Sequence, residues 1–144
     1  MGLIKLPNDS IEYFKNNLDE IFASGNFAEG QWNKKLADFV ANLSGAKVSI
    51  PTSSNGAGLV SLMSLYRHYH NRKNVMIQSN TMYGVKTMIG AAGCSLAGFI
   101  DCKIESLMPS FDDVKNAISK FDKKDKKSLI ILLSHIGGII NPDI

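Results

Sequence analysis

The chain has 144 residues and a mass of 15.7 kDa, which is the length of one ordinary domain. Its hydrophobic content of 44% and charged content of 20% are typical of a globular protein and exclude a disordered or collagen-like chain. The net charge of +3 comes almost entirely from lysine, without the arginine forks and interleaved aromatic side chains of nucleic-acid grooves, so we expect no nucleic-acid partner.

The sequence has no targeting signal, and its cysteines show no metal-site pattern. No apolar run approaches the roughly 20 residues that a membrane span needs, and residues 1–6 do not form a secretory signal. The two cysteines, Cys94 and Cys102, lack the spacing and the neighbouring histidines of a metal site. We therefore expect a cytoplasmic protein with no metal site, in which both thiols are buried and reduced.

Two amphipathic helices are predicted at the start of the chain. Asp9 and Ser10 can cap the first helix, whose apolar residues recur at helical spacing until Gly25. The second helix carries a similar apolar stripe and ends at Gly45. Residues 1–45 are thus predicted to form an N-terminal helical segment.

Short apolar strands then alternate with helices over residues 46–144. The predicted strands are 48–50, 75–77, 96–100 and 129–133, and the predicted helices are 59–69, 81–92 and 111–121. Nearly continuous apolar strands alternating with helices are typical of a parallel sheet covered on both faces. The expected fold class is α/β, with three α/β/α layers and a mostly parallel sheet, preceded by the two helices. The lysine-rich run 123–127 is predicted to be a solvated loop.

Ligands in such sheets bind at the carboxyl ends of the strands, which here are residues 52–56, 79–83 and 134–138. The first segment is rich in small residues and opens into a helix, which favours either a phosphate site or a plain capped turn. Tyr83 could stack on a planar ligand or simply pack. His135 is more typical of a structural residue than of a catalyst, and no nucleophile–base pair can be assembled, so no catalytic residue is predicted.

Five segments taken in order resemble the DegT/DnrJ/EryC1/StrS family, the sugar-type aminotransferases of fold type I that use pyridoxal 5′-phosphate. The segments are residues 24–30, 39–47, 54–59, 78–83 and 134–144, and residues 93–101 also resemble the family's next step from helix to strand. The resemblance implies that residues 46–144 are the N-terminal part of a fold type I large domain, truncated at the C-terminus. It also implies a homo-oligomer.

The resemblance assigns cofactor-binding roles to a few positions. Ser54, Asn55 and Gly56 would hold the cofactor phosphate through backbone N–H groups, although Asn55 stands for the usual Gly and Gly56 for the usual Thr. The family's ring-stacking aromatic residue is replaced by Met82, so the following Tyr83 is the candidate for stacking.

The family's lysine that holds the cofactor covalently, and its acidic partner for the pyridine nitrogen, would both follow Ile144. We therefore expect a fragment that binds pyridoxal 5′-phosphate weakly or not at all and is inactive alone. In the intact enzyme the amino group would pass from an amino acid to a nucleotide-linked keto-sugar. The alternatives are a fragment of a family dehydratase, a non-catalytic module that binds a phosphate ligand or a partner, and an unrelated small α/β protein.

Overall fold

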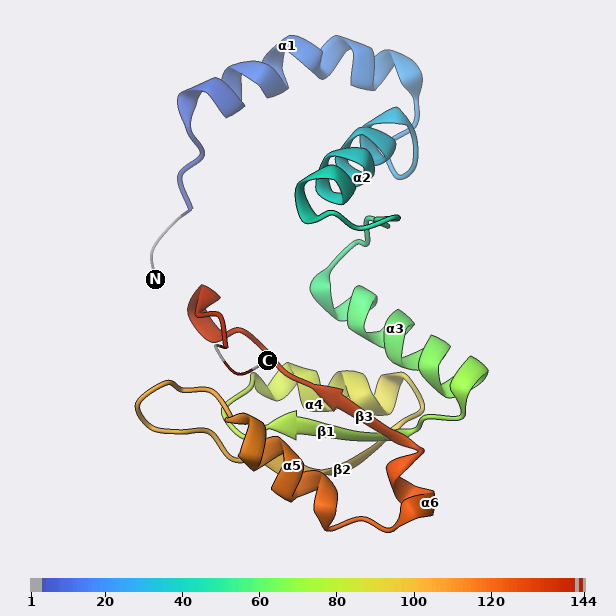
Figure 1. The fold of residues 1–144 in the computed structure, drawn as a ribbon. Helices are drawn as coiled ribbons and strands as arrows, with labels where there is room; N and C mark the ends of the chain where they lie inside the picture. The colour runs from blue at the N-terminus through green and yellow to red at the C-terminus, as the bar shows by residue number, and fades with distance from the viewer. Residues whose placement is uncertain (1–3, 142, 144) are drawn as a thin grey trace. The chain divides into compact units, whose positions relative to one another are not determined.

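The computed structural model describes residues 4–141 and Asp143, and the chain divides between Pro51 and Thr52 into two compact units. The N-terminal unit contains α1 (Asn8–Ser24) and α2 (Gln31–Ser44), shown in blue and teal in Figure 1. The C-terminal unit contains the sheet and the remaining helices.

Both predicted N-terminal helices are present, but α1 begins earlier than its predicted caps. Pro7 occupies the N-cap position with φ −58°, and neither Asp9 nor Ser10 caps the helix. Asp9 lies in the first turn instead, where its carboxylate faces the positive end of the helix dipole. The ends are as predicted, because α1 and α2 stop at Gly25 and Gly45 with φ of 64° and 71°, a left-handed conformation that glycine adopts without strain.

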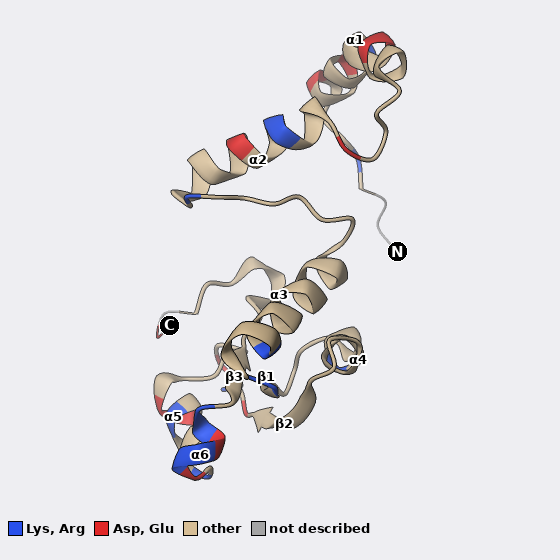
Figure 2. Ribbon diagram, turned by 90° about the vertical axis from the view of Figure 1, so that its right-hand side faces the viewer, with Lys and Arg blue, Asp and Glu red and all other residues tan. Residues whose placement is uncertain are grey.

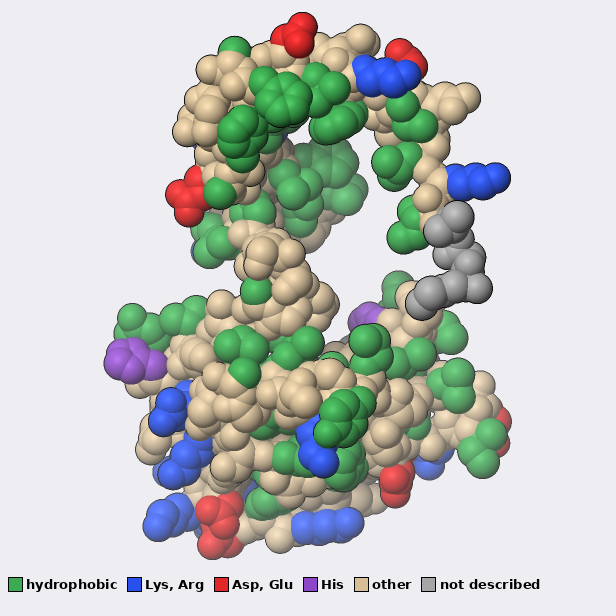
Figure 3. Space-filling view, turned by 180° about the vertical axis from the view of Figure 1, so that it is seen from behind, with side chains coloured by type: hydrophobic (Ala, Val, Ile, Leu, Met, Phe, Trp, Pro, Cys, Tyr) green, Lys and Arg blue, Asp and Glu red, His purple; other side chains and the backbone are tan. Residues whose placement is uncertain are grey.

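In the N-terminal unit, α1 and α2 contact each other through aromatic side chains, and many of their apolar side chains are exposed. Tyr13 and Trp32 pack edge to face with ring centroids 6.2 Å apart, and the Lys35 ammonium lies 3.9 Å from the Trp32 ring. No residue of α1 or α2 is fully buried. Figure 3 shows the hydrophobic side chains that these helices leave on the surface.

The C-terminal unit is built on three parallel strands in the order β2-β1-β3. The strands are β1 (Asn74–Gln78), β2 (Ser95–Ile100) and β3 (Leu129–Leu132). The helices are α3 (Asn55–His70), α4 (Tyr83–Ala91), α5 (Phe111–Ser119) and α6 (Lys123–Lys126), and a 3-10 turn, η1 (Ile136–Gly138), follows β3.

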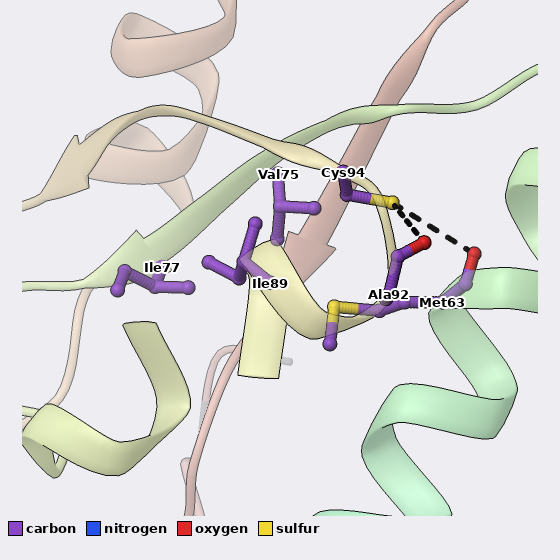
Figure 4. Close-up of a cluster of buried hydrophobic side chains, with 6 residues drawn as sticks. All are labelled: Met63, Val75, Ile77, Ile89, Ala92 and Cys94. Atoms are coloured by element: carbon purple, nitrogen blue, oxygen red, sulfur yellow. Dashed lines mark hydrogen bonds between the residues drawn. The ribbon is translucent and has the colours of Figure 1, made fainter. Parts of the chain in front are cut away.

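Alternate residues of β1, the central strand, are buried in two hydrophobic clusters on opposite faces of the sheet. Val75 and Ile77 join a cluster that includes Met63 of α3 and Ile89 of α4, as Figure 4 shows. Met76 faces the opposite side and packs in a cluster with Ala117 of α5. The chain passes from β1 to β2 and then back across β1 to β3, so right-handed crossovers place α4 and α5 on opposite faces. The predicted three-layer parallel α/β architecture is confirmed.

The predicted strand at residues 48–50 is wrong. This segment has no strand pairing, and the side chains of Val48 and Ile50 are 72% and 78% exposed. Two β-branched residues, Val48 and Ile50, favour extended backbone but do not form a strand without a partner. The sheet therefore has three strands, not four, among residues 4–141 and Asp143.

One helix prediction and one loop prediction also need correction. Helix α3 starts at Asn55 instead of residue 59, because the Ser54 hydroxyl accepts the Ala57 N–H and caps an extra turn. The lysine run 123–127 is solvated as predicted, but most of it forms the short helix α6, whose N-cap Asp122 accepts the Asp125 N–H. Figure 2 shows the lysines of α6 in blue.

Candidate functional site

A cavity of about 600 Å³ lies at the carboxyl edge of the sheet, and we call it the edge cavity. Its walls come from the start of α3, from residues 81–88 and from residues 132–137. Asn55, Met82 and His135, one from each segment that the sequence singled out, all line it. The size falls within the range of small-molecule sites, roughly 300–1,000 Å³.

The strand pairing explains why a cavity opens here. The β1–β3 ladder ends at the pair Ile77–Leu132, and beyond it the two chains continue as loops. The chain after β1 enters α4, whereas the chain after β3 enters η1. This is the crevice outside the carboxyl ends of parallel strands where ligands of open α/β sheets bind.

The N-terminus of α3 adjoins this cavity through Asn55. Ser54 closes the turn, because its hydroxyl accepts the Ala57 N–H at 3.1 Å and its carbonyl accepts the Gly58 N–H at 3.1 Å. The N–H groups of Asn55 and Gly56 come first in the helix and cannot reach a carbonyl of their own helix. In the described part of the chain nothing else bonds to them. Such a helix end favours an anion.

Gly56 lies where the first turn of α3 approaches α4. A Cβ at this position would come 2.8 Å from Cε of Met88, which lines the edge cavity. Glycine therefore allows this contact, and the thioether of Met88 closes the gap between the helices. Gly56 itself does not line the edge cavity, and neither does Ser54.

Met82 and Tyr83 lie at the start of α4 and line different hollows, although they are adjacent in sequence. Met82 is 74% exposed and lines the edge cavity, whereas Tyr83 is 75% exposed and lines a neighbouring hollow beside Lys86 and Phe99. The Lys86 ammonium lies 5.9 Å from the centroid of the Tyr83 ring. The structure thus brings Met82, but not Tyr83, to the cavity that Asn55 lines.

The remaining polar lining consists of hydroxyls and one imidazole. The Thr81 and Ser134 hydroxyls lie 3.2 Å apart in hydrogen-bond contact, and His135 follows. The cavity lining includes no lysine, aspartate or glutamate. No cluster of metal-ligating side chains occurs in residues 4–141 or at Asp143. Cys94 is buried as expected, but Cys102 is only half-buried, and both are free thiols.

Sequence reasoning missed Gln78, the last residue of β1. Its side chain is completely buried and bonds to the chain beyond β3, although it does not itself line the cavity. The available signal was a carboxamide directly after the apolar run 75–77, since a polar group that is buried at a strand end needs partners.

The fold and the cavity together define an α/β protein with a ligand-sized cavity at the carboxyl edge of a parallel sheet, beside a free helix N-terminus. The model of the DegT/DnrJ/EryC1/StrS aminotransferase family matches residues 8–144, so the chain belongs to this family. No curated protein and no solved structure matches the chain. No helix in the described residues is long and apolar enough to cross a membrane.

The family is generally dependent on pyridoxal 5′-phosphate, and the residues of the edge cavity fit part of this group. The free amides at the start of α3 suit its phosphate, and the apolar walls formed by Leu59, Val85 and Leu132 suit its ring. No lining residue can supply a covalent amine or a carboxylate for the ring nitrogen.

Proposed function

We propose that the edge cavity is the phosphate and ring part of a pyridoxal 5′-phosphate site in an aminotransferase of the nucleotide-sugar type. The observation that carries this proposal is the position of Asn55, which lines the cavity and also begins α3 with an uncommitted amide. When bound, the cofactor supplies the electron sink for the transfer of an amino group from an amino acid to a keto-sugar.

The chain's own residues would divide the binding between them. The amide of Asn55 would hold the phosphate, the next amide, that of Gly56, lies just outside the cavity lining, and Ser54 would keep both oriented by closing the turn. Met82 would contact the ring in place of an aromatic residue, since its side chain lines the cavity. Stacking by Tyr83 would require α4 to begin one residue later than it does.

We further propose that this chain alone transfers no amino group, because the cavity lining has neither a lysine nor a carboxylate. The same observation favours a second candidate, a non-catalytic module that binds a phosphate ligand. We also propose that the protein is cytoplasmic, in keeping with its free cysteines, and self-associates, in keeping with the exposed apolar side chains of α1 and α2.

The test removes one amide without harming the helix. Proline at Asn55 lacks an N–H but suits the first position of a helix, and Ser54 already has the extended backbone that a following proline requires, with φ −164° and ψ 162°. Asn55→Ala is the matched control, since it removes the side chain and keeps the amide.

Pyridoxal 5′-phosphate, pyridoxal and inorganic phosphate would each be titrated into the labelled protein, with NMR shifts of the Gly56 and Ala57 amides as the readout, because this detects weak binding. We expect both phosphate-bearing ligands to give saturable shifts. Asn55→Pro should weaken their binding about tenfold or more, the loss of one hydrogen bond to a charged group. Asn55→Ala should leave it nearly unchanged.

Equal affinities for the proline and alanine variants would remove the phosphate role from α3. Borohydride treatment in the presence of pyridoxal 5′-phosphate tests the catalytic part separately. Stoichiometric labelling of a single lysine would contradict the proposal that the chain lacks the covalent anchor.

A further inference from the structure

The side chain of Gln78 is hydrogen-bonded at both ends although it is completely buried. Its Oε1 accepts the backbone N–H of Ser134 at 2.8 Å, and its Nε2 donates to Oδ1 of Asn80 at 2.8 Å. A buried carboxamide is costly without partners, so this geometry is a specific feature of the strand end.

The bond to Ser134 continues the connection between β1 and β3 past the point where the ladder stops. The last backbone pair is Ile77–Leu132, and Ser134 lies two residues further along. The Gln78 side chain therefore acts as an additional rung and holds the first loop residues after β3 against the end of β1.

The other end of the carboxamide is linked through Asn80 to the loop after β2. Asn80, which accepts from Gln78, donates its own Nδ2 to the carbonyl of Leu107 at 2.8 Å, and the Cys102 thiol contacts the same Asn80 Oδ1 at 3.3 Å. Gln78 and Asn80 together thus connect the segments that follow all three strands.

Two residues held by this network form the polar wall of the edge cavity. Ser134 is fixed through its amide, and its hydroxyl contacts Thr81, which lies three residues after Gln78. The Thr81 N–H also bonds to the Gln78 carbonyl at 3.3 Å. His135 follows Ser134 directly, so its position depends on the same anchor.

We propose that Gln78 is a positioning residue of the edge cavity, which sets the position of Ser134 and His135 relative to Thr81 in the polar wall. The effect of Gln78 on ligand affinity rests on the proposed function. The effect of Gln78 on the geometry of the wall is independent of that function, so the two effects can be tested separately.

The experiment compares three variants of the whole chain. Gln78→Met has similar length and loses both hydrogen bonds, whereas Gln78→Glu keeps an oxygen that can accept the Ser134 N–H. Ile100→Val, a buried substitution at the end of β2, serves as the control for general loss of stability. The readouts are amide exchange at Ser134, the NMR shifts of Thr81 and His135, and titration with pyridoxal 5′-phosphate.

In Gln78→Met we expect Ser134 exchange to accelerate about tenfold beyond the change seen in Ile100→Val, as for one lost hydrogen bond. The Thr81 and His135 signals should shift, and the ligand should bind several-fold more weakly. Gln78→Glu should restore the protection of Ser134, which a merely space-filling role would not explain.

Ser134 exchange in Gln78→Met no faster than in Ile100→Val would overturn the proposal. If Gln78→Met does not fold, loss of Ser134 protection in Gln78→Glu would overturn it instead. A wild-type chain that shows no ligand-induced shifts would contradict the proposed function alone, because the exchange comparison still decides whether Gln78 positions the wall.

Discussion

Gly93 is the residue at which the backbone between α4 and β2 is most constrained. Its φ of 68° lies in the left-handed region, and a Cβ there would come 2.7 Å from Nη1 of Arg67. The neighbouring Cys94 thiol is buried against the carbonyl of Met63. Burial raises the pKa of this thiol, and the charge of Arg67 offsets only part of that increase. A glycine is thus needed where α3, α4 and β2 meet.

Gly93→Ala should destabilise the protein by about 1–2 kcal/mol, since a side chain in the left-handed region is strained and Arg67 must also move. Gly90→Ala is the matched control, because Gly90 is a helical residue of α4 with nothing within 4 Å of the added Cβ. It should be neutral or stabilising by up to about 1 kcal/mol. Urea unfolding measures both, and a Gly93→Ala variant as stable as Gly90→Ala would contradict this account.

At the scale of an element, α5 shows how a helix start is fixed by its own sequence. Ser110 and Asp113 form a reciprocal capping box, in which the Ser110 hydroxyl accepts the Asp113 N–H at 3.3 Å and the Asp113 carboxylate accepts the Ser110 N–H at 3.0 Å. Hydrogen bonds from the Ser110 side chain and backbone, and the Lys103 ammonium 3.4 Å away, hold the pKa of Asp113 below its ordinary 3.8.

A lowered pKa in the folded state means that ionised Asp113 stabilises the protein above about pH 4, and that this contribution is lost as the pH falls through the folded-state value. Asp113→Asn should therefore be less stable than wild type at pH 7, and the difference should shrink toward pH 2. Denaturant unfolding at several pH values measures it. Asp112→Asn, in the same turn but outside the capping box, controls for the helix dipole, and an equal pH trend there would contradict the assignment.

The elements that the sequence predicts well are those whose signals are local. The capped start of α5 and the glycine ends of α1 and α2 depend on neighbouring residues, and the three real strands are continuous apolar runs. Residues 48–50 also carry β-branched residues but have no partner strand, and pairing is a non-local property that a triplet cannot encode. The cavity was predictable as a place, because strand ends converge, whereas the contact of Gln78 with Ser134 joins residues 56 apart in sequence.

At the scale of the whole molecule, the exposed apolar side chains are concentrated enough to affect association. On α2 alone, Leu36, Phe39 and Leu43 recur at helical spacing and are 54%, 64% and 77% exposed. Large exposed apolar patches are uncommon on monomeric proteins. This supports the proposed self-association, although the sequence pattern predicts only the stripe and not its exposure.

We expect light scattering coupled to gel filtration to give a mass of at least two chains, and Phe39→Glu to lower it because the stripe loses an aromatic side chain and gains a charge. Asn42→Glu adds the same charge to the same helix without removing an apolar group, and it should leave the mass unchanged. A wild-type protein that elutes as a monomer would contradict this proposal.

The two methionines that line the edge cavity make its walls susceptible to oxidation. Met82 lies open to solvent, and Met88 lies against the first turn of α3 at Gly56. Oxidation of a thioether to a sulfoxide turns an apolar, flexible wall into a polar one. Peroxide would therefore reach Met82 first, and a preparation kept under reducing conditions would present a drier, more adaptable cavity than one left to age in air.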